Sequence, residues 1–180
     1  MKWYVTKDEI NYVNLLLDHN TTYYIQWDIT GNTNSNLVNN KLTSDVSNWN
    51  NKVKSSARLI TADEIWEITK KDNNVSNWSS SSSDNSFYFE GSGHSSDEPN
   101  KYAWLFNYTT CQGIFKSGCN ISDGNTMGYW TSSKVYDSNN IWAVSLLGSI
   151  WSLPASEGDS IDTKIGIRPV ITLSKDNVQK

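Results

Sequence analysis

The stretch between residues 134 and 159 carries the side chains best suited to holding a ligand. Two aromatic rings expected to face outward, those of Tyr136 and Trp151, stand there among small hydroxyl and amide groups. Such rings offer flat contact area and the small polar groups offer hydrogen bonds, at little cost in conformational entropy, as in antibody paratopes. Almost nothing in the stretch can titrate or attack a substrate, so the pattern favours binding over catalysis.

The period of two along a β-strand decides which of these side chains face outward. A strand over residues 142–146 would turn Trp142 and Val144 toward the core and leave Ala143 and Ser145 outside. The same alternation, continued through the neighbouring strand and loops, predicts a ligand-binding face. Its members are Lys134, Tyr136, Asp137, Asn139, Asn140, Ala143, Ser145, Leu147, Ser149, Trp151, Leu153, Ser156 and Asp159.

An alternative interpretation leaves this face without a function. Trp151 and Leu147 would then be ordinary core residues, and the preceding loop would be solvated surface. Exposed aromatic side chains among small polar ones tend to mark interaction sites, so the binding face is the favoured interpretation.

Two cysteines, Cys111 and Cys119, flank a short segment that contains Gly113 and Gly118. The glycines let the segment fold back and bring the two sulfurs together, which favours a disulfide. Two free thiols or half of a metal site are the alternatives, although two cysteines without nearby His or further Cys make a poor zinc site.

Glu98, Pro99 and Asn100 match a tripeptide with which many sugar-binding lectins hold calcium. Carboxylate and amide oxygens suit this hard cation, and Asp97 adds another. Those lectins need a later Trp-Asn-Asp, and none follows here. A chance match in a polar loop is the favoured interpretation, so Glu98 and Asn100 are weak calcium candidates, and no cofactor is expected.

The residues that most often catalyse reactions lack their usual partners. His19 and His94 have no Ser, Cys or acidic partner at a recognised spacing, which favours hydrogen-bonded loop histidines. Asp18, Asp63 and Glu64 are better explained as turn and cap residues than as a catalytic pair. The sequence therefore predicts no catalytic residue.

Composition narrows the class of protein. A chain of 180 residues suffices for one domain with a real core. Charged residues make up 19% and hydrophobic ones 37%, while Asn, Ser, nine Trp and nine Tyr fill the gap, as in many secreted and surface proteins. The net charge of −4 without a Lys/Arg cluster argues against nucleic acid as a partner. No apolar run approaches the roughly 20 residues of a membrane-spanning helix, and no signal peptide opens the chain, so an exported form would have lost its targeting or anchoring segment.

The front of the chain must supply a hairpin or a helix. Residues 2–6 are β-rich and alternate, and alternation returns over 13–17, which favours a β-hairpin. A helix over 8–17 is the alternative, because Thr6 and Glu9 have the spacing of a capping box.

Two further helices and several strands complete the expected fold. A stripe at Leu42, Val46, Trp49 and Val53 predicts one amphipathic helix, and Thr61 with Glu64 predicts the capping box of another. Residues 72–86 read as a flexible surface loop. Short strands are expected over 57–60, 87–89, 102–106, 128–133, 142–146 and 168–173. The fold class is therefore α+β, and pairing of the first strand with 168–173 would bring the termini together.

Six segments carry a resemblance to a known family. They are WYV at 3–5, NLLLDHNTT at 14–22, ARLITADEI at 57–65, YAWL at 102–105, GYWTSS at 128–133 and GIRPVI at 166–171. In this order they resemble the C-type-lectin-like fold, and more closely such domains of secreted and pilin-like proteins of Gram-positive gut bacteria. The resemblance implies one domain over residues 1–180, with two helices packed on small antiparallel sheets, paired N- and C-terminal strands and a buried, structural Arg168.

The resemblance also implies a function. The fold family includes the variable ligand-binding proteins of diversity-generating retroelements, whose variable residues precede the C-terminal strand; residues 134–159 correspond to them. We therefore expect a non-catalytic, adhesin- or receptor-like domain, extracellular or on the cell surface. Its partner would be a protein or glycan on a cell, phage or host surface, and only a missing anchor would bring it to a membrane.

Two other functions remain open. One is a structural surface or pilin-like subunit, because fold alone does not decide function. The other is an oxidase related to formylglycine-generating enzymes, which also share the fold. That chemistry uses a copper-binding cysteine pair, a role that Cys111 and Cys119 could serve only as free thiols.

Overall fold

The chain has a mixed α+β fold. The computed structural model describes residues 1–22, 24–69, 77–81, 86–88, 102–106, 128–145, 148–160 and 163–177, and every structural statement below concerns these residues. The strands are β1 (Trp3–Asp8), β2 (Tyr12–Leu17), β3 (Arg58–Leu59), β4 (Phe87–Tyr88), β5 (Gly128–Lys134), β6 (Asn140–Ser145), β7 (Ser149–Pro154), β8 (Asp159–Ser160), β9 (Thr163–Gly166) and β10 (Pro169–Ser174). The helices are α1 (Leu37–Asp45), α2 (Asn51–Lys54), α3 (Ala62–Thr69), α4 (Ala103–Phe106) and a 3₁₀ helix at Lys175–Asn177.

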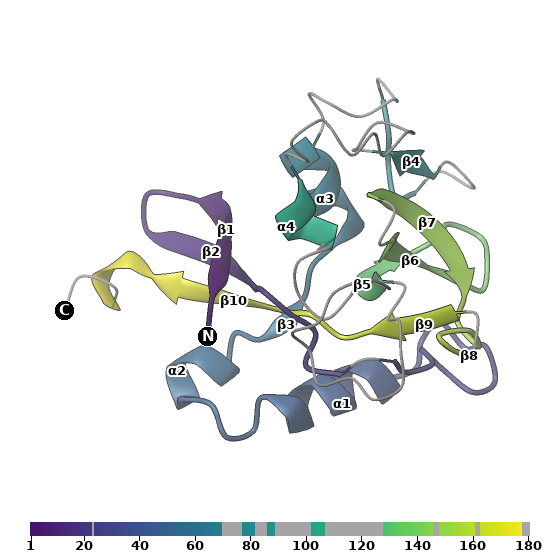
Figure 1. Ribbon diagram of the computed structural model, residues 1–180, viewed down its shortest axis with the longest axis horizontal. Coiled ribbons are helices and arrows are strands. Elements are labelled where there is room, and N and C mark those ends of the chain that lie inside the picture. The colour runs from purple at the N-terminus through teal and green to yellow at the C-terminus, as the bar shows by residue number, and fades with distance from the viewer. Residues whose placement is uncertain are drawn as a thin grey trace.

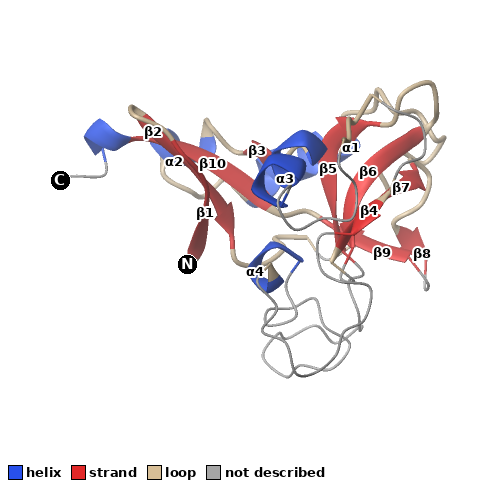
Figure 2. Cartoon of the chain, turned by 90° about the horizontal axis from the view of Figure 1, so that it is seen from above, coloured by secondary structure: helices blue, strands red, loops and turns tan. Residues whose placement is uncertain are grey.

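Two β-sheets lie at opposite sides of the described part of the molecule, with α3 between them (Figure 1 and Figure 2). One has four strands in the order β1-β2-β10-β3, and the other has six in the order β4-β7-β6-β5-β9-β8. Neighbouring strands are antiparallel except for β5 and β9, which are parallel. The expected α+β class is confirmed.

The front of the chain is a β-hairpin, as predicted, and the alternative helix over 8–17 was wrong. β1 pairs with β2, with Trp3 opposite Leu17. The C-terminal strand β10, however, pairs with β2, with Ile171 opposite Leu15, so the predicted pairing of the first and last strands was wrong. The physical reason is composition: β2 carries three consecutive leucines that suit a central strand, whereas the charged and hydroxyl side chains of β1 suit an edge.

The predicted stripe over residues 42–53 is divided between two helices. α1 ends at Asp45 and α2 begins at Asn51, so one continuous helix was wrong. Asn50 starts the second helix, because its side chain accepts a hydrogen bond from the backbone N–H of Lys52 at 3.0 Å. Asn side chains favour caps over helix interiors for this reason. The apolar stripe still buries Val46 beside α1.

The capping box of α3 is confirmed. The backbone N–H of Glu64 donates to Oγ1 of Thr61 at 3.0 Å, and Oε2 of Glu64 accepts from the backbone N–H of Thr61 at 2.9 Å. Arg58 adds two contacts to the same carboxylate, at 2.7 and 2.6 Å. The start of α3 is thereby tied to β3.

Between α3 and β5 one strand prediction was wrong, and one side chain expected at the surface is buried. Residues 102–106 form a turn and helix α4 rather than a strand, with the backbone N–H of Leu105 donating to the carbonyl of Tyr102 at 2.8 Å. Trp78, predicted in a flexible surface loop, is 8% exposed and packs its ring 4.9 Å from that of Phe87. The free energy gained by burying a large aromatic ring exceeds the cost of ordering the polar loop that carries it.

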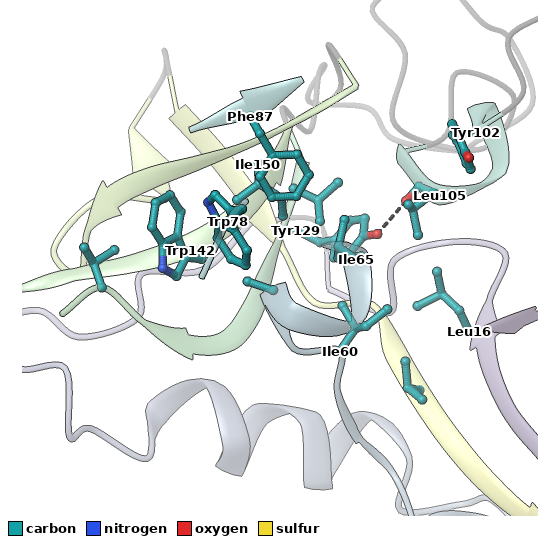
Figure 3. Packing of buried hydrophobic residues seen from close by; sticks show 14 residues of the cluster. Leu16, Ile60, Ile65, Trp78, Phe87, Tyr102, Leu105, Tyr129, Trp142 and Ile150 are labelled. Atoms are coloured by element: carbon teal, nitrogen blue, oxygen red, sulfur yellow. Dashed lines mark hydrogen bonds between the residues drawn. The ribbon is translucent and has the colours of Figure 1, made fainter. Parts of the chain in front are cut away.

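The six-stranded sheet is buried on both faces. The first core holds Trp142, Val144 and Ile150 with Ile65 of α3 (Figure 3). The second core holds Trp130 and Ala143 with Trp27 and residues of α1. The rings of Trp130 and Trp142 are both fully buried. A sheet covered on both faces leaves its strand ends and turns as the surface that remains accessible.

Arg168 is buried and structural, as expected. Its Nε donates to the carbonyl of Leu17 at 2.6 Å, and its two Nη atoms donate to the carbonyls of Leu105 at 2.8 Å and Trp104 at 2.7 Å. Burial lowers the pKa of the guanidinium, and the neighbouring Tyr129 opposes that shift. Arg168 therefore joins β2, α4 and the start of β10 through backbone carbonyls.

Candidate ligand-binding site

Strand residues of the predicted binding face lie on one side of the sheet, as expected, but other parts of the chain cover that side. Register places Ala143 opposite Trp151 and Ser145 opposite Ser149, so these side chains share one side of the sheet, as expected. That side is the second core. The exposed fractions are 0% for Ala143, 2% for Ser145, 6% for Ser149 and 8% for Leu153, so the outward prediction was wrong for these four residues. Trp27 and α1, far away in sequence, belong to the same core and cover this side.

Trp151 is partly buried and packs against the second core. Its indole Nε1 is buried and has no hydrogen-bond partner among the described residues. A buried N–H without an acceptor destabilises a fold by about 1–3 kcal/mol. Trp151 therefore packs at least part of its ring in the second core, as the alternative interpretation of the sequence expected.

The predicted residues that stay accessible lie in two turns. Lys134, Tyr136, Asp137 and Asn139 are exposed in and beside the turn between β5 and β6, and Tyr136 is 65% exposed. Ser156 is exposed in the turn after β7. Asn140 is half-buried at the start of β6, and Asp159 begins β8.

Several candidates lie outside the described residues. They are Leu147 of the predicted face, Cys111 and Cys119 of the predicted disulfide, His94, and the weak calcium candidates Glu98 and Asn100.

A third segment completes the surface. Residues 26–36 fold around Asp28, whose Oδ1 accepts from the backbone N–H groups of Thr30 at 2.8 Å and Asn32 at 3.0 Å. The side-chain hydrogen bond from Thr30, at 2.5 Å, and the bond from Asn32 hold the pKa of the Asp28 carboxyl well below its usual value. Trp27 anchors the segment by donating from Nε1 to the carbonyl of Thr33 at 3.2 Å.

Backbone hydrogen bonds tie the three segments together. The N–H of Asp28 donates to the carbonyl of Ala155 at 2.8 Å, and the N–H of Ala155 donates to the carbonyl of Asn139 at 3.0 Å. Gln26 adds a side-chain bond to the carbonyl of Ser156 at 2.9 Å. We call residues 26–36, 134–139 and 155–158 the loop cluster. A ligand meeting it would contact a braced surface rather than three independent loops.

The loop cluster contains a shallow polar hollow of about 440 Å³. Its lining residues are Thr33, Asn34, Lys134, Val135, Asp137, Ser138 and Asn139. Nζ of Lys134 contacts Oδ1 of Asn34 and so bridges two segments a hundred residues apart. The hollow offers hydroxyl and amide groups together with one positive and one negative side chain. Tyr136 and Ile29, which is 75% exposed, add apolar area on the same loops.

The turn that carries Tyr136 is fixed by its own residues. Asp137 has φ 51°, a left-handed conformation that Asp and Asn tolerate better than most residues. The N–H of Val135 donates to the carbonyl of Asn140 at 3.0 Å, and Ser138 accepts from the N–H of Asn140 at 3.1 Å. The Asp-Ser-Asn-Asn run was thus a usable signal, whereas nothing local marked Thr33 and Asn34 as its neighbours.

A second groove, of about 700 Å³, lies between the β1–β2 hairpin and α3. Its lining includes Lys7, Asp63, Glu64 and Glu67, but Glu64 is engaged by Arg58 and Thr61, and Asp63 accepts from Ser80 at 2.8 Å. Burial raises the pKa of the Glu64 carboxyl, but the hydrogen bonds from Arg58 and Thr61 outweigh it, so the pKa lies below its usual value. The cap role predicted for Glu64 is confirmed.

The remaining chemical candidates of the described chain are also structural. His19 lies 2.5 Å from Asp18 through Nδ1 and Oδ1, the hydrogen-bonded loop histidine that was expected. Among the described residues there is no group of three or more His, Cys, Asp or Glu that could hold a metal ion. Within the same residues, no helix is long and apolar enough to cross a membrane.

Comparisons with protein-family models, with curated proteins and with solved structures gave no match to this chain.

Proposed function

We propose that this chain is a non-catalytic ligand-binding domain and that its ligand docks on the loop cluster. One observation carries the proposal. The hollow of about 440 Å³ is built by two segments far apart in sequence, and Tyr136, which is exposed, lies in sequence between two of its lining residues, Val135 and Asp137. Small-molecule sites commonly have volumes of about 300–1,000 Å³ and a few convergent polar groups.

The ligand is a polar surface, either a glycan or a protein loop. Hydroxyl, amide and charged groups line the hollow, and Tyr136 exposes an aromatic ring on the same turn. A tyrosine ring contributes contact area with little entropy lost, and the Ser and Asn groups contribute adaptable hydrogen bonds. Braced loops keep the cost of binding low because their shape is largely set before the ligand arrives.

We further propose that the fold is C-type-lectin-like and that the domain works outside the cell or on its surface. Three features support the fold proposal: two small sheets, a C-terminal strand beside the N-terminal hairpin, and a buried arginine just before that strand. The low content of charged residues and the many Asn, Ser and aromatic residues support the location.

Binding of the labelled protein to a glycan array and to intact bacterial and host cells tests the proposal. Tyr136→Ala should reduce binding about tenfold or more, the loss expected when an aromatic anchor worth at least 1.4 kcal/mol is removed. Ile10→Ala is the matched control, because Ile10 is 89% exposed in the hairpin turn, away from the loop cluster. Equal binding by both variants would refute the proposed site.

A further inference from the structure

β1 has an outer edge without a neighbouring strand in the described part of the chain. It stands first in the four-stranded sheet, next to β2, and lies on the outer side of the hairpin (Figure 2). The carbonyl of Lys2 accepts from the N–H of Asp18 at 3.0 Å. Because antiparallel strands alternate between paired and outward backbone groups, Tyr4 then bonds to Leu16. The backbone N–H and C=O of Trp3 and Val5 therefore point away from the sheet.

This edge is short. The register shifts between Val5 and Lys7, so that β1 bulges at Thr6, whose Oγ1 donates to the carbonyl of Asn14 at 3.2 Å. A bulge interrupts regular pairing and is a common protection of sheet edges. The regular edge thus offers two residues, Trp3 and Val5, and it fits a partner strand whose own regular edge is equally short.

The side chains on the edge are apolar and lie on one face. Val5 is 56% exposed, and Trp3 packs edge-on against Trp49 with ring centroids 5.6 Å apart. Trp3 also lines a groove of about 360 Å³, together with Leu15, Trp49, Val53, Ile171 and Leu173. An exposed valine beside open backbone groups makes the edge a template for a further strand.

We propose that a second copy of this chain pairs antiparallel with β1 about a two-fold axis at Tyr4, so that the two four-stranded sheets form one continuous sheet. In this register Trp3 of each copy stands opposite Val5 of the other. Each of these pairs exchanges both backbone hydrogen bonds that the edge leaves open. Aromatic and β-branched side chains opposite each other stabilise antiparallel strands.

The sequence of β1 favours its own copy as the partner. In the proposed register Lys2 faces Thr6 of the second copy, so that no like-charged side chains stand opposite each other along the regular edge. The register also uses all the open backbone groups of Trp3 and Val5 on both copies. Because the two-fold axis is perpendicular to the sheet, both apolar grooves open on the same face, where Trp3 and Val5 of the two copies form one apolar row.

Sedimentation equilibrium from micromolar to near-millimolar concentration tests the pairing. We expect a monomer–dimer equilibrium in the unchanged protein. Val5→Pro removes an outward N–H and leaves the β1–β2 bonds intact, so its dimer dissociation constant should rise about tenfold or more. Val5→Thr is the matched control, because it keeps both the N–H and the β-branched shape, and it should dimerise like the unchanged protein.

Hydrogen exchange locates the interface residue by residue and needs no variant. At high concentration the amides of Trp3 and Val5 should gain protection, while the amide of Tyr4, already bonded to β2, should not change. A protein that stays monomeric throughout, or a dimer that protects neither Trp3 nor Val5, overturns the proposal. The loop cluster lies at the opposite end of the molecule (Figure 1), so Tyr136→Ala should dimerise normally whatever its effect on ligand binding.

Discussion

Arg168 and Tyr129 share one acceptor. Nη1 of Arg168 lies 2.8 Å, and Oη of Tyr129 lies 2.5 Å, from the carbonyl oxygen of Leu105. The guanidinium also stands over the tyrosine ring, 5.3 Å from its centroid. Burial raises the pKa of Tyr129 to about 12, which keeps the hydroxyl protonated as a donor. One carbonyl thus fixes α4 to both β5 and the entry to β10, and the bond from Tyr129 is the dashed line in Figure 3.

Replacing Arg168 by Lys should destabilise the protein by about 3 kcal/mol or more, because an ammonium cannot reach three carbonyls at once and stays buried. Tyr129→Phe is the milder comparison. It removes one hydrogen bond, leaves Leu105 with the bond from Arg168, and should cost about 1 kcal/mol. Urea unfolding followed by tryptophan fluorescence measures both. A smaller loss for Arg168→Lys than for Tyr129→Phe would contradict the anchoring role.

Glu64→Gln should cost about 1–2 kcal/mol at neutral pH, through a weakened cap and a lost ion pair with Arg58. The folded-state pKa of Glu64 lies below the usual value of 4.5 for a glutamate, so the stabilisation is complete above that pH. It disappears as the pH falls through the lowered folded-state value. The difference in unfolding free energy between the two proteins should therefore shrink in acid. A difference that grows in acid would argue against the assignment.

Trp151→Ala should destabilise the protein by about 2–4 kcal/mol, because the ring packs against the second core. Tyr136→Ala should change stability by no more than about 0.5 kcal/mol, as expected for an exposed side chain. Trp151→Phe should cost less than Trp151→Ala, because both variants lose the unpartnered indole N–H but only phenylalanine keeps an aromatic ring in the second core. Thermal and chemical unfolding decide between them, and equal stability of the Trp151→Ala and Tyr136→Ala proteins would place Trp151 outside the core.

Gly158→Ala should cost about 2 kcal/mol or more. Gly158 has φ 109°, and a Cβ there would lie 2.6 Å from the carbonyl oxygen of Ile25 and 2.8 Å from Cζ2 of Trp130. Gly31→Ala is a matched control in the same loop cluster. Gly31 has φ 76° but no atom within 4 Å of the added Cβ. The substitution should therefore destabilise the protein through backbone strain alone, by about 1 kcal/mol. Similar losses in the two variants would mean that the contact at Ile25 relaxes freely.

Local interactions explain what the sequence predicted correctly. The capping box needs Thr61 and Glu64 alone, and the hairpin needs alternation over a dozen residues. The turn at Asp137 likewise follows from its own Asp, Ser and Asn residues. The burial of Arg168 came from the family resemblance, which supplied the one correct long-range expectation.

Long-range packing explains what was missed. Alternation put Ala143 and Ser145 on the correct side of β6, but whether that side is wet depends on Trp27 and α1, a hundred residues earlier. For the same reason Thr33 and Asn34 could not be assigned to the hollow. Four-residue helices such as α2 and α4 leave too short a pattern for periodicity to detect, so a capping Asn or a buried arginine decides their place.

The position of β10 between β2 and β3 has a consequence for biosynthesis. Ribosomes release a polypeptide from its amino end, so the hairpin emerges long before residues 169–174 exist to sit beside it. Until then β2 has no partner strand on the side that β10 later occupies, and Leu15 and Leu16 lack the strand that pairs beside them. We expect the nascent chain to bind chaperones during translation and to complete the four-stranded sheet only after β10 has left the ribosomal exit tunnel.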